Sequence, residues 1–179
     1  MSLGKIADVS KLQAARAANI DLWSPVVFAA LQRLKSGPAT EDLEALLLDR
    51  QFNVIAHQAI WAVTEISADV RWKYCAQRYF SADTLARWKK LESSGIPKMS
   101  QFVPGLRHEH VVERAELKSM LESATSPEGV AAILEKAESC VVTAEEDRRL
   151  NKSHQGWDRY RLAKTAPVRV WDRLKLCWR

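Results

Sequence analysis

Residues 1–98 of this chain carry apolar side chains at helical spacing, and this pattern constrains the fold more than any other feature. From Phe52 to Phe80 the chain contains no proline or glycine, and its apolar residues are dense enough for a buried helix rather than a surface helix. This part of the chain is therefore predicted to fold as a series of helices.

Capping residues and chain breakers mark where these helices are expected to begin and end. Ser24-Pro25 is typical of a helix start, because the hydroxyl caps free backbone amides and proline fits the first helical position. The Gly-Pro pair at 37–38 is expected to end that helix. A further break is expected near 67–69, and a last helix is expected over 81–94.

The second helix of the series is expected to begin after Thr40, which caps an acidic first turn. Leu43, Leu46 and Leu47 then continue one periodic apolar face. His57 fits this pattern as a packed, half-buried histidine better than as a metal ligand.

A boundary is expected between residues 96 and 106, where two prolines and a glycine interrupt the chain. After it the pattern changes to short runs of β-branched residues that alternate with helical segments. The expected elements are strands at 110–112, 140–143 and 168–171 and helices over 113–122 and 127–139.

These patterns predict an α+β protein that is predominantly α-helical, with a helical N-terminal part followed by a small mixed part with two or three short strands. The first part spans residues 1–98 and the second spans residues 99–179, unless the two share one continuous core. A chain of 179 residues buries about 70% of its unfolded surface, so a core of this size is stable without metals or crosslinks.

Cysteine usage and hydropathy indicate the compartment. Cys75, Cys140 and Cys177 are odd in number, far apart and without CxxC spacing, which argues against a disulfide framework and a cysteine-rich zinc site. No stretch approaches the roughly 20 apolar residues that cross a bilayer, and the N-terminus lacks the apolar run of a secretory signal. A cytoplasmic protein without membrane contact is expected.

The C-terminal segment is basic and rich in tryptophan. The whole chain has a net charge of +5, whereas residues 151–179, with eight Lys or Arg against two Asp, carry +6. Interleaved cations and aromatics suit nucleic acid or an acidic protein surface, and a solvated edge with core tryptophans is the alternative. The residues expected to contact a partner are Trp157, Arg159, Tyr160, Arg161, Lys164, Arg169, Arg173 and Lys175.

Two imidazoles stand at alternate positions near the first expected strand. In an extended chain, His108 and His110 point to one side and Glu109 points to the other. Imidazole binds first-row metals and acts as a base near neutral pH, so the pair predicts a hydrolytic or metal-binding site. The alternative is one hydrogen-bonded structural histidine and one exposed histidine.

A capping box follows the second expected strand. Thr143 and Glu146 satisfy each other's backbone amides, which explains Glu146 without a catalytic role. The helix that begins here is expected to carry Asp147, Asn151 and His154 on one face, because these residues are four and three positions apart.

Together, the two strands and this helix resemble the ββα-metal layout of HNH nucleases over residues 106–154. The resemblance implies that His110 activates water and that a divalent metal, Mg or Zn, neutralises the phosphate. The residues carried over are His110 and His108 as catalytic residues and Asp147, His154 and Glu109 as metal ligands. The chemistry is consistent, because phosphodiester hydrolysis needs a proton acceptor for water and a cation for the developing charge.

The sequence therefore predicts a nucleic-acid-associated protein with a divergent, metal-dependent HNH-like nuclease site, of the kind found in defence or mobile-element systems. The second hypothesis is a non-enzymatic module, an inhibitor or assembly component, that binds protein or nucleic acid through the basic segment 157–179. The two hypotheses differ in whether His108 and His110 are required.

Overall fold

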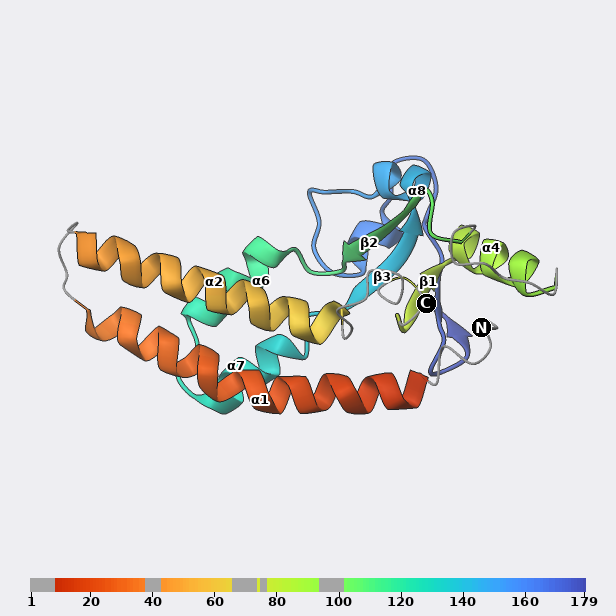
Figure 1. Cartoon of the computed structure of the whole chain (residues 1–179). Helices are drawn as coiled ribbons and strands as arrows, with labels where there is room; N and C mark the ends of the chain where they lie inside the picture. The colour runs from red at the N-terminus through yellow and green to blue at the C-terminus, as the bar shows by residue number, and fades with distance from the viewer. Residues whose placement is uncertain (1–8, 38–42, 66–73, 75–76, 94–101) are drawn as a thin grey trace.

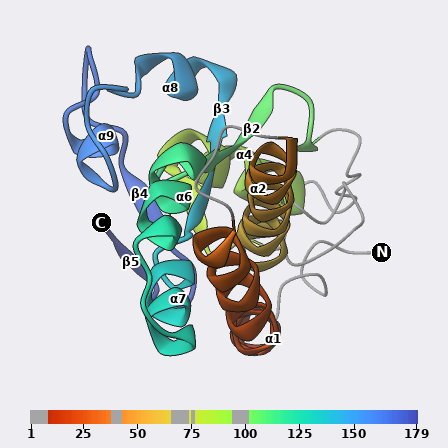
Figure 2. The same ribbon diagram turned by 90° about the vertical axis from the view of Figure 1, so that its left-hand side faces the viewer.

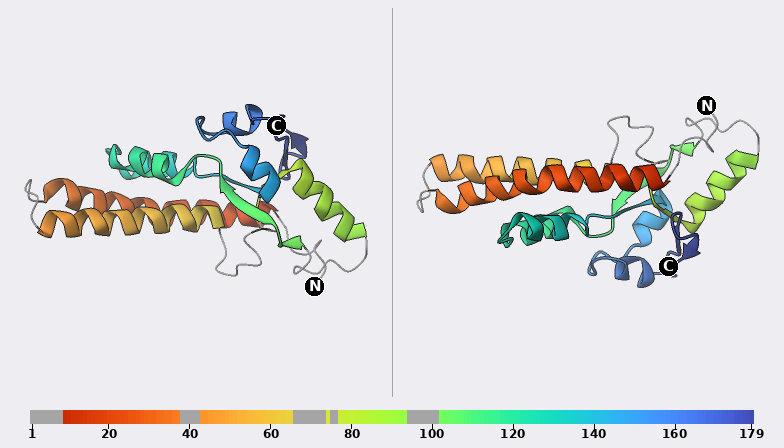
Figure 3. Two further views of the ribbon diagram at one scale, coloured as in Figure 1. Left: turned by 90° about the horizontal axis from the view of Figure 1, so that it is seen from above. Right: turned by 90° about the horizontal axis from the view of Figure 1, so that it is seen from below.

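The structure is a computed structural model that describes residues 9–37, 43–65, 74, 77–93 and 102–179. It has the predicted α+β architecture, in which helices dominate and a helical N-terminal part is joined to a small mixed sheet (Figure 1). The long helices extend away from the sheet, so the protein is elongated (Figure 3).

Two long antiparallel helices, α1 (Val9–Ser36) and α2 (Leu43–Glu65), form the helical layer, and α6 (Arg114–Glu122) and α7 (Pro127–Leu134) lie along them (Figure 2). These helices share one apolar core. Its buried members include Ile20, Val27 and Leu31 from α1, Phe52, Ile60 and Val63 from α2, Leu117 and Leu121 from α6, and Val130 and Leu134 from α7. Because α6 and α7 belong to the second half of the sequence, both halves of the chain build this core.

Helix α1 runs through Ser24 and Pro25, so the predicted helix start at this position is wrong. Proline supplies no N–H for the carbonyl of Asp21, and the Ser24 hydroxyl donates a hydrogen bond to the Ile20 carbonyl at 2.6 Å. The helix continues because residues on both sides of the proline, Ile20 and Val27, are buried in the helical core. Tertiary burial here outweighs the local backbone cost.

Helix α2 buries a different face from the one that the sequence predicts. Leu43, Leu46 and Leu47 have exposed fractions of 73%, 63% and 48%, whereas Leu48 and Phe52 are buried. Leucine occupies so many positions in the first turns of α2 that the spacing alone does not single out one face.

Several predicted features lie outside the described residues. They are the cap Thr40, the break at 67–69, Cys75 and Pro97, the first proline of the expected boundary. Cys140 and Cys177 are free thiols, the first buried and the second exposed. Among the described residues, no helix combines the length and the apolar character needed to cross a bilayer.

Within the described residues, five short strands form one sheet in the order β2-β3-β1-β4-β5. The pair β1–β3 is parallel and the other pairs are antiparallel. The strands are β1 (Tyr79–Ser81), β2 (Leu106–His110), β3 (Ser139–Thr143), β4 (Val170–Asp172) and β5 (Cys177–Trp178).

The sequence predicts β3 to within one residue but places the other strands less well. The first predicted strand, 110–112, is wrong because β2 ends at His110, and the third, 168–171, is shifted from β4. Strands β1 and β5 are missed, because segments of three and two residues carry no periodic signal. The edge position of β2 leaves one side of this strand without a neighbouring strand.

Helices cover both faces of the sheet. Helix α4 (Ala82–Ser93), which confirms the prediction for 81–94, lies on one face, where Phe80, Leu85, Trp88, Phe102, Leu106 and Val141 form a second apolar cluster. Helices α8 (Ala144–Arg149) and α9 (Asp158–Arg161) lie at the other face. The cluster there includes Tyr79, Val111, Cys140, Val142, Leu150, Tyr160, Val168 and Val170.

The segment that connects α7 to β3, residues 134–139, is held by α1. We refer to it as the α7–β3 linker. The Arg16 guanidinium donates to the carbonyls of Leu134, Glu135 and Ala137 at 3.1, 2.8 and 3.4 Å. These carbonyls lie at the negative end of α7, where a cation is favoured. The predicted helix 127–139 is therefore too long, because the chain turns toward β3 after Leu134.

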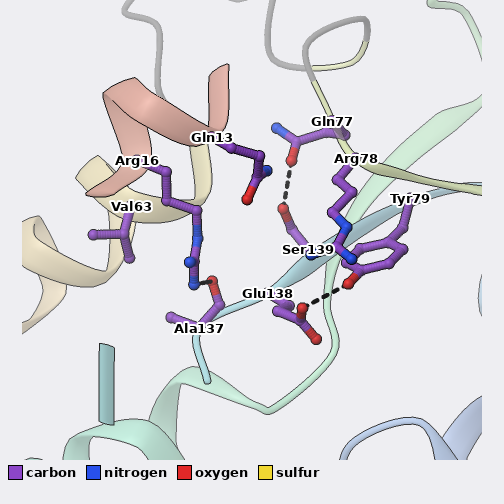
Figure 4. Close-up of a pocket in the computed structure, with 9 residues that line it drawn as sticks. All are labelled: Gln13, Arg16, Val63, Gln77, Arg78, Tyr79, Ala137, Glu138 and Ser139. Atoms are coloured by element: carbon purple, nitrogen blue, oxygen red, sulfur yellow. Dashed lines mark hydrogen bonds between the residues drawn. The ribbon is translucent and has the colours of Figure 1, made fainter. Parts of the chain in front are cut away.

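Side chains of the α7–β3 linker also bind the sheet, around a small cavity of about 20 Å³ (Figure 4). The Glu138 carboxylate accepts hydrogen bonds from Tyr79 Oη at 2.7 Å and from Trp157 Nε1 at 3.2 Å. Ser139 Oγ donates to Gln77 Oε1 at 2.6 Å. The linker therefore connects the helical layer, the centre of the sheet and the C-terminal segment.

Asp172 in β4 is a fully buried carboxylate with a strong set of donors. It accepts hydrogen bonds from Arg78 Nε and Nη2 at 2.9 and 2.6 Å and from the backbone amides of Leu174 and Lys175 at 3.0 and 3.1 Å. Burial by itself raises the pKa of this carboxyl, but the hydrogen bonds from Arg78 and from the backbone outweigh it, so the pKa of Asp172 is lowered.

We expect Asp172→Asn to lower the free energy of unfolding at neutral pH by about 2–3 kcal/mol, because it leaves a partly buried guanidinium without its counter-charge. A lowered carboxyl pKa stabilises the fold above the ordinary Asp pKa of about 4 and loses this effect as the pH falls through the native value. Urea unfolding of both proteins between neutral and acidic pH should therefore show two curves that converge in acid. Equal stabilities at neutral pH would contradict the assignment.

Candidate functional site

An open cleft of about 620 Å³ lies at the end of β2. Its walls come from α2, from the start of α6 and from the chain after α8, and these elements are far apart in the sequence. The residues that line it are His57, Glu109, His110, Glu113, Arg114, Ala115, Lys118, Lys152 and Arg159. Three of the residues predicted as site residues from sequence, Glu109, His110 and Arg159, thus open into one hollow together with three further cations.

The alternation of β2 determines which side chains meet. The His108 and His110 rings lie on the same side of the strand, as predicted, with centroids 5.3 Å apart and planes at 88°. The His108 side chain is only 2% exposed, and its Nδ1 lies 3.9 Å from Glu65 Oε1 on α2. His108 is thus an interior residue that packs between β2 and α2, whereas His110 lines the cleft.

His110 is held by a hydroxyl of α2. Its Nε2 lies 3.4 Å from Thr64 Oγ1, and the Thr64 hydroxyl donates its own proton to the Ile60 carbonyl at 2.8 Å. Because a hydroxyl has a single proton, Thr64 Oγ1 can only accept from the imidazole, so the Nε2 of His110 carries a proton.

Arg159 on α9 joins the end of β2 to the start of α6. Its side chain is 2% exposed, and its Nη2 lies 2.7 Å from Glu109 Oε1 and 3.5 Å from Glu113 Oε1. Its Nη1 donates to the His110 carbonyl at 3.0 Å. Among the described residues, its buried Nε has no hydrogen-bond partner. One guanidinium therefore touches three residues of the cleft.

The charge of Glu109 is only partly favoured by its surroundings. Burial raises the pKa of Glu109, and the carboxylate of Asp147 on α8 raises it further. The Arg159 guanidinium lowers this pKa, but the pKa is raised overall. Arg159 is thus the group that keeps a carboxylate at this position.

The predicted catalytic histidines and the predicted metal ligand Glu109 lie on different sides of β2. Glu109 faces Arg159 and Asp147, whereas His108 and His110 face α2. Within the described residues, no group of three or more His, Cys, Asp and Glu side chains is arranged to hold a metal ion. The divalent metal, Mg or Zn, therefore stays a prediction.

The prediction that Asp147, Asn151 and His154 share a helical face is wrong, because α8 ends at Arg149. The Asn151 side chain accepts hydrogen bonds from the backbone N–H and hydroxyl of Ser153 at 3.2 and 2.6 Å. Such local bonds compete with helix propagation. His154 therefore lies in a loop beyond α8.

The capping box at Thr143 and Glu146 is confirmed. Glu146 is buried and also accepts a hydrogen bond from Ser81 Oγ of β1 at 2.5 Å. Its carboxylate thus fixes α8 to the central strand of the sheet, a structural role that the capping motif alone does not predict.

The predicted partner-binding residues of the C-terminal segment divide into two groups. Arg159 and Tyr160 are buried, Trp157 binds Glu138, and Arg173 donates to the Gln77 carbonyl and lies over the Phe80 ring. These four residues hold the fold together. The exposed group consists of Arg161, Lys164, Arg169 and Lys175, of which Arg161 pairs with Asp158 and Arg169 lies over the Trp178 ring.

Sequence reasoning missed most of the cleft. His57 was expected to be half-buried, but it is exposed and lines the cleft. Arg114 and Lys118 are four residues apart in a correctly predicted helix, and this spacing is the signal that could have placed them on one face. Glu113 and Lys152 carry no comparable signal.

Comparisons with family models, with curated proteins and with solved structures give no match to this chain.

We expect the neutral His110 ring to carry its proton on Nε2, because Thr64 Oγ1 accepts from it. Long-range ¹H–¹⁵N correlation spectra in the neutral range should show this tautomer, with His110→Asn used to assign the signals. Thr64→Val keeps the shape of the side chain but removes the acceptor, and it should abolish the preference. A His110 signal of the Nδ1–H tautomer in the unchanged protein would contradict the geometry.

Proposed function

We propose that this protein is nucleic-acid-associated and that it binds the phosphate backbone in the cleft at the end of β2. The observation that carries the proposal is the charge of the lining residues. Four cations stand against two carboxylates, and both carboxylates, Glu109 and Glu113, face the same buried Arg159. Arg114, Lys118 and Lys152 therefore supply the attraction for an anion.

The lysines of the cleft can bind an anion without giving up a strong interaction. Lys152 is exposed, and Lys118 is paired with Glu122 at 2.8 Å in a partly exposed i,i+4 salt bridge. Surface pairs of this kind contribute only about 0–1 kcal/mol, so a phosphate can replace Glu122 as the partner of Lys118. Backbone phosphates are bound mainly by such lysine and arginine contacts.

One feature of the fold supports the HNH-like interpretation. Strands β2 and β3 are antiparallel, and α8 begins directly after β3 with its capping box and packs against both strands. This order of elements supports a nucleic-acid-acting site near Glu109 and His110. The position of His108 and His110 on the opposite side of β2 from Glu109 does not support it.

The second candidate is binding of nucleic acid or an acidic protein through the C-terminal segment. Its support is the exposed group Arg161, Lys164, Arg169 and Lys175. Its aromatic residues argue less for it than the sequence implied, because Trp157 and Tyr160 are engaged in the interior.

A pair of matched double variants separates the two surfaces. We expect Lys118→Ala with Lys152→Ala to weaken binding to a generic single-stranded oligonucleotide and to reduce the slope of log K against log salt by roughly 2, because two phosphate contacts are lost. Lys164→Ala with Lys175→Ala removes the same charge from the C-terminal segment and should leave the slope unchanged. Fluorescence anisotropy over a salt series measures both.

The opposite result identifies the other surface. If the C-terminal double variant loses the salt dependence and the cleft variant retains it, the cleft proposal fails. If the unchanged protein shows no salt-dependent binding to DNA or RNA, nucleic-acid association itself fails.

A further inference from the structure

We propose that Trp61 stacks on an unpaired nucleobase at the rim of the cleft, so that the cleft takes single-stranded nucleic acid. This inference rests on the proposed binding of backbone phosphates in the same cleft. It adds a second contact, to a base, and it names the class of strand that can make this contact.

Trp61 on α2 leaves much of its indole in water. Its exposed fraction is 45%, although its neighbours Ile60 and Val63 are buried in the helical core. Trp88, in contrast, is only 7% exposed and lies against the Phe80 ring. Among the described residues, no aromatic or cation–π contact involves Trp61. The indole therefore keeps surface that a flat ligand can cover.

The helical spacing of α2 places Trp61 beside the cleft. His57, Trp61 and Thr64 are four and three residues apart, so they share one side of the helix. His57 lines the cleft, and Thr64 contacts His110, which lines it as well. Trp61 thus lies between two positions that border the cleft. It is not itself a lining residue, so it stands at the rim.

The cations that would hold phosphates lie on other walls of the cleft. Helix α6, which packs against α2 (Figure 2), carries Arg114 and Lys118 one turn apart, and Lys152 follows α8. Proteins that bind single strands combine a positively charged groove for the backbone with aromatic side chains on which bases stack. The cleft supplies the groove, and Trp61 supplies the aromatic side chain.

Stacking on Trp61 requires a base whose flat face is open. In a duplex the bases are stacked on one another and present only their edges in the grooves. The bases of a single strand can turn outward and stack on a protein ring. Every base has such a face, so this contact selects neither a base sequence nor a sugar. Single strands of DNA and of RNA both fit the site.

The test uses the full chain and fluorescence anisotropy with four labelled probes of equal length. They are a single-stranded DNA of mixed sequence, the same sequence as RNA, the DNA annealed to its complement, and a strand of abasic deoxyribose phosphates. We expect Trp61→Ala to weaken binding of both single strands by about 5- to 100-fold, the range for loss of one stacked base. Binding of the duplex and of the abasic strand should not change, because neither offers an open base.

The salt dependence and two matched variants identify stacking as the cause. Trp61→Ala should leave the slope of log K against log salt unchanged, because no phosphate contact is lost. Trp61→Phe keeps an aromatic face and should retain most of the affinity. Trp178→Ala removes the same side chain at a position of similar exposure, 41%, in the C-terminal segment, and it should bind like the unchanged protein. Thermal melting of each variant checks that it is folded.

The opposite results overturn the inference. They are an unchanged affinity in Trp61→Ala, an equal loss for single strands, duplex and abasic strand, and a loss of single-strand binding in Trp178→Ala in place of Trp61→Ala. The proposed function still stands in the first case if Lys118→Ala with Lys152→Ala reduces the salt slope. If the unchanged protein binds none of the four probes, the proposed function fails first and the inference fails with it.

Discussion

The α7–β3 linker is the constraint on which the rest of the structure depends. The last carbonyls of a helix lack partners within the helix. Arg16 donates hydrogen bonds to the carbonyls of Leu134, Glu135 and Ala137, at and just after the end of α7, where the chain turns toward the sheet. The Glu138 carboxylate accepts hydrogen bonds from Tyr79 in β1 and from Trp157 in the C-terminal segment, and so it joins these two parts of the chain. A polar segment of the chain thus connects two apolar cores that share few side chains.

The same linker determines where β2 ends. The Val111 backbone N–H donates to the Glu138 carbonyl at 2.9 Å, directly after His110. Ser139 contacts the carbonyl of Thr64 at 3.3 Å, which brings the end of α2 to the start of β3. His110 therefore meets Thr64 because both are anchored to one short segment. The orientation of His110 is a property of the whole fold and not of its own strand.

How much the sequence predicts depends on how local the cause is. The capping box at Thr143, the start of α7 at Pro127 and the end of α1 before Gly37 are set by neighbouring residues, and each can be recognised from them. Pro25 does not mark a helix start. The hydrogen bond that proline removes is a local cost, whereas the burial of α1 against other helices, which outweighs this cost, cannot be seen in the neighbouring residues. The short strands β1 and β5 exist only because a longer neighbour pairs with them.

The candidate site shows the same division. Alternation along β2 predicts that His108 and His110 share a side, and the structure agrees. It cannot predict which of the two is interior, because Glu65 and Thr64 on α2 decide this. Glu113 and Arg159 are 46 positions apart in the numbering, and no spacing rule connects them. Residues that meet only through tertiary structure are those that sequence reasoning misses.

The burial of Arg159 determines how the charges of the cleft are arranged. A guanidinium that is almost wholly removed from water needs a compensating anion, and Glu109 supplies one at 2.7 Å. The second carboxylate, Glu113, then adds little, because it is more exposed and more distant. Within the part of the chain that the structure describes, the buried Nε of Arg159 has no hydrogen-bond partner. Arg159 is thus compensated by Glu109 and Glu113, and the excess positive charge of the cleft comes from Arg114, Lys118 and Lys152.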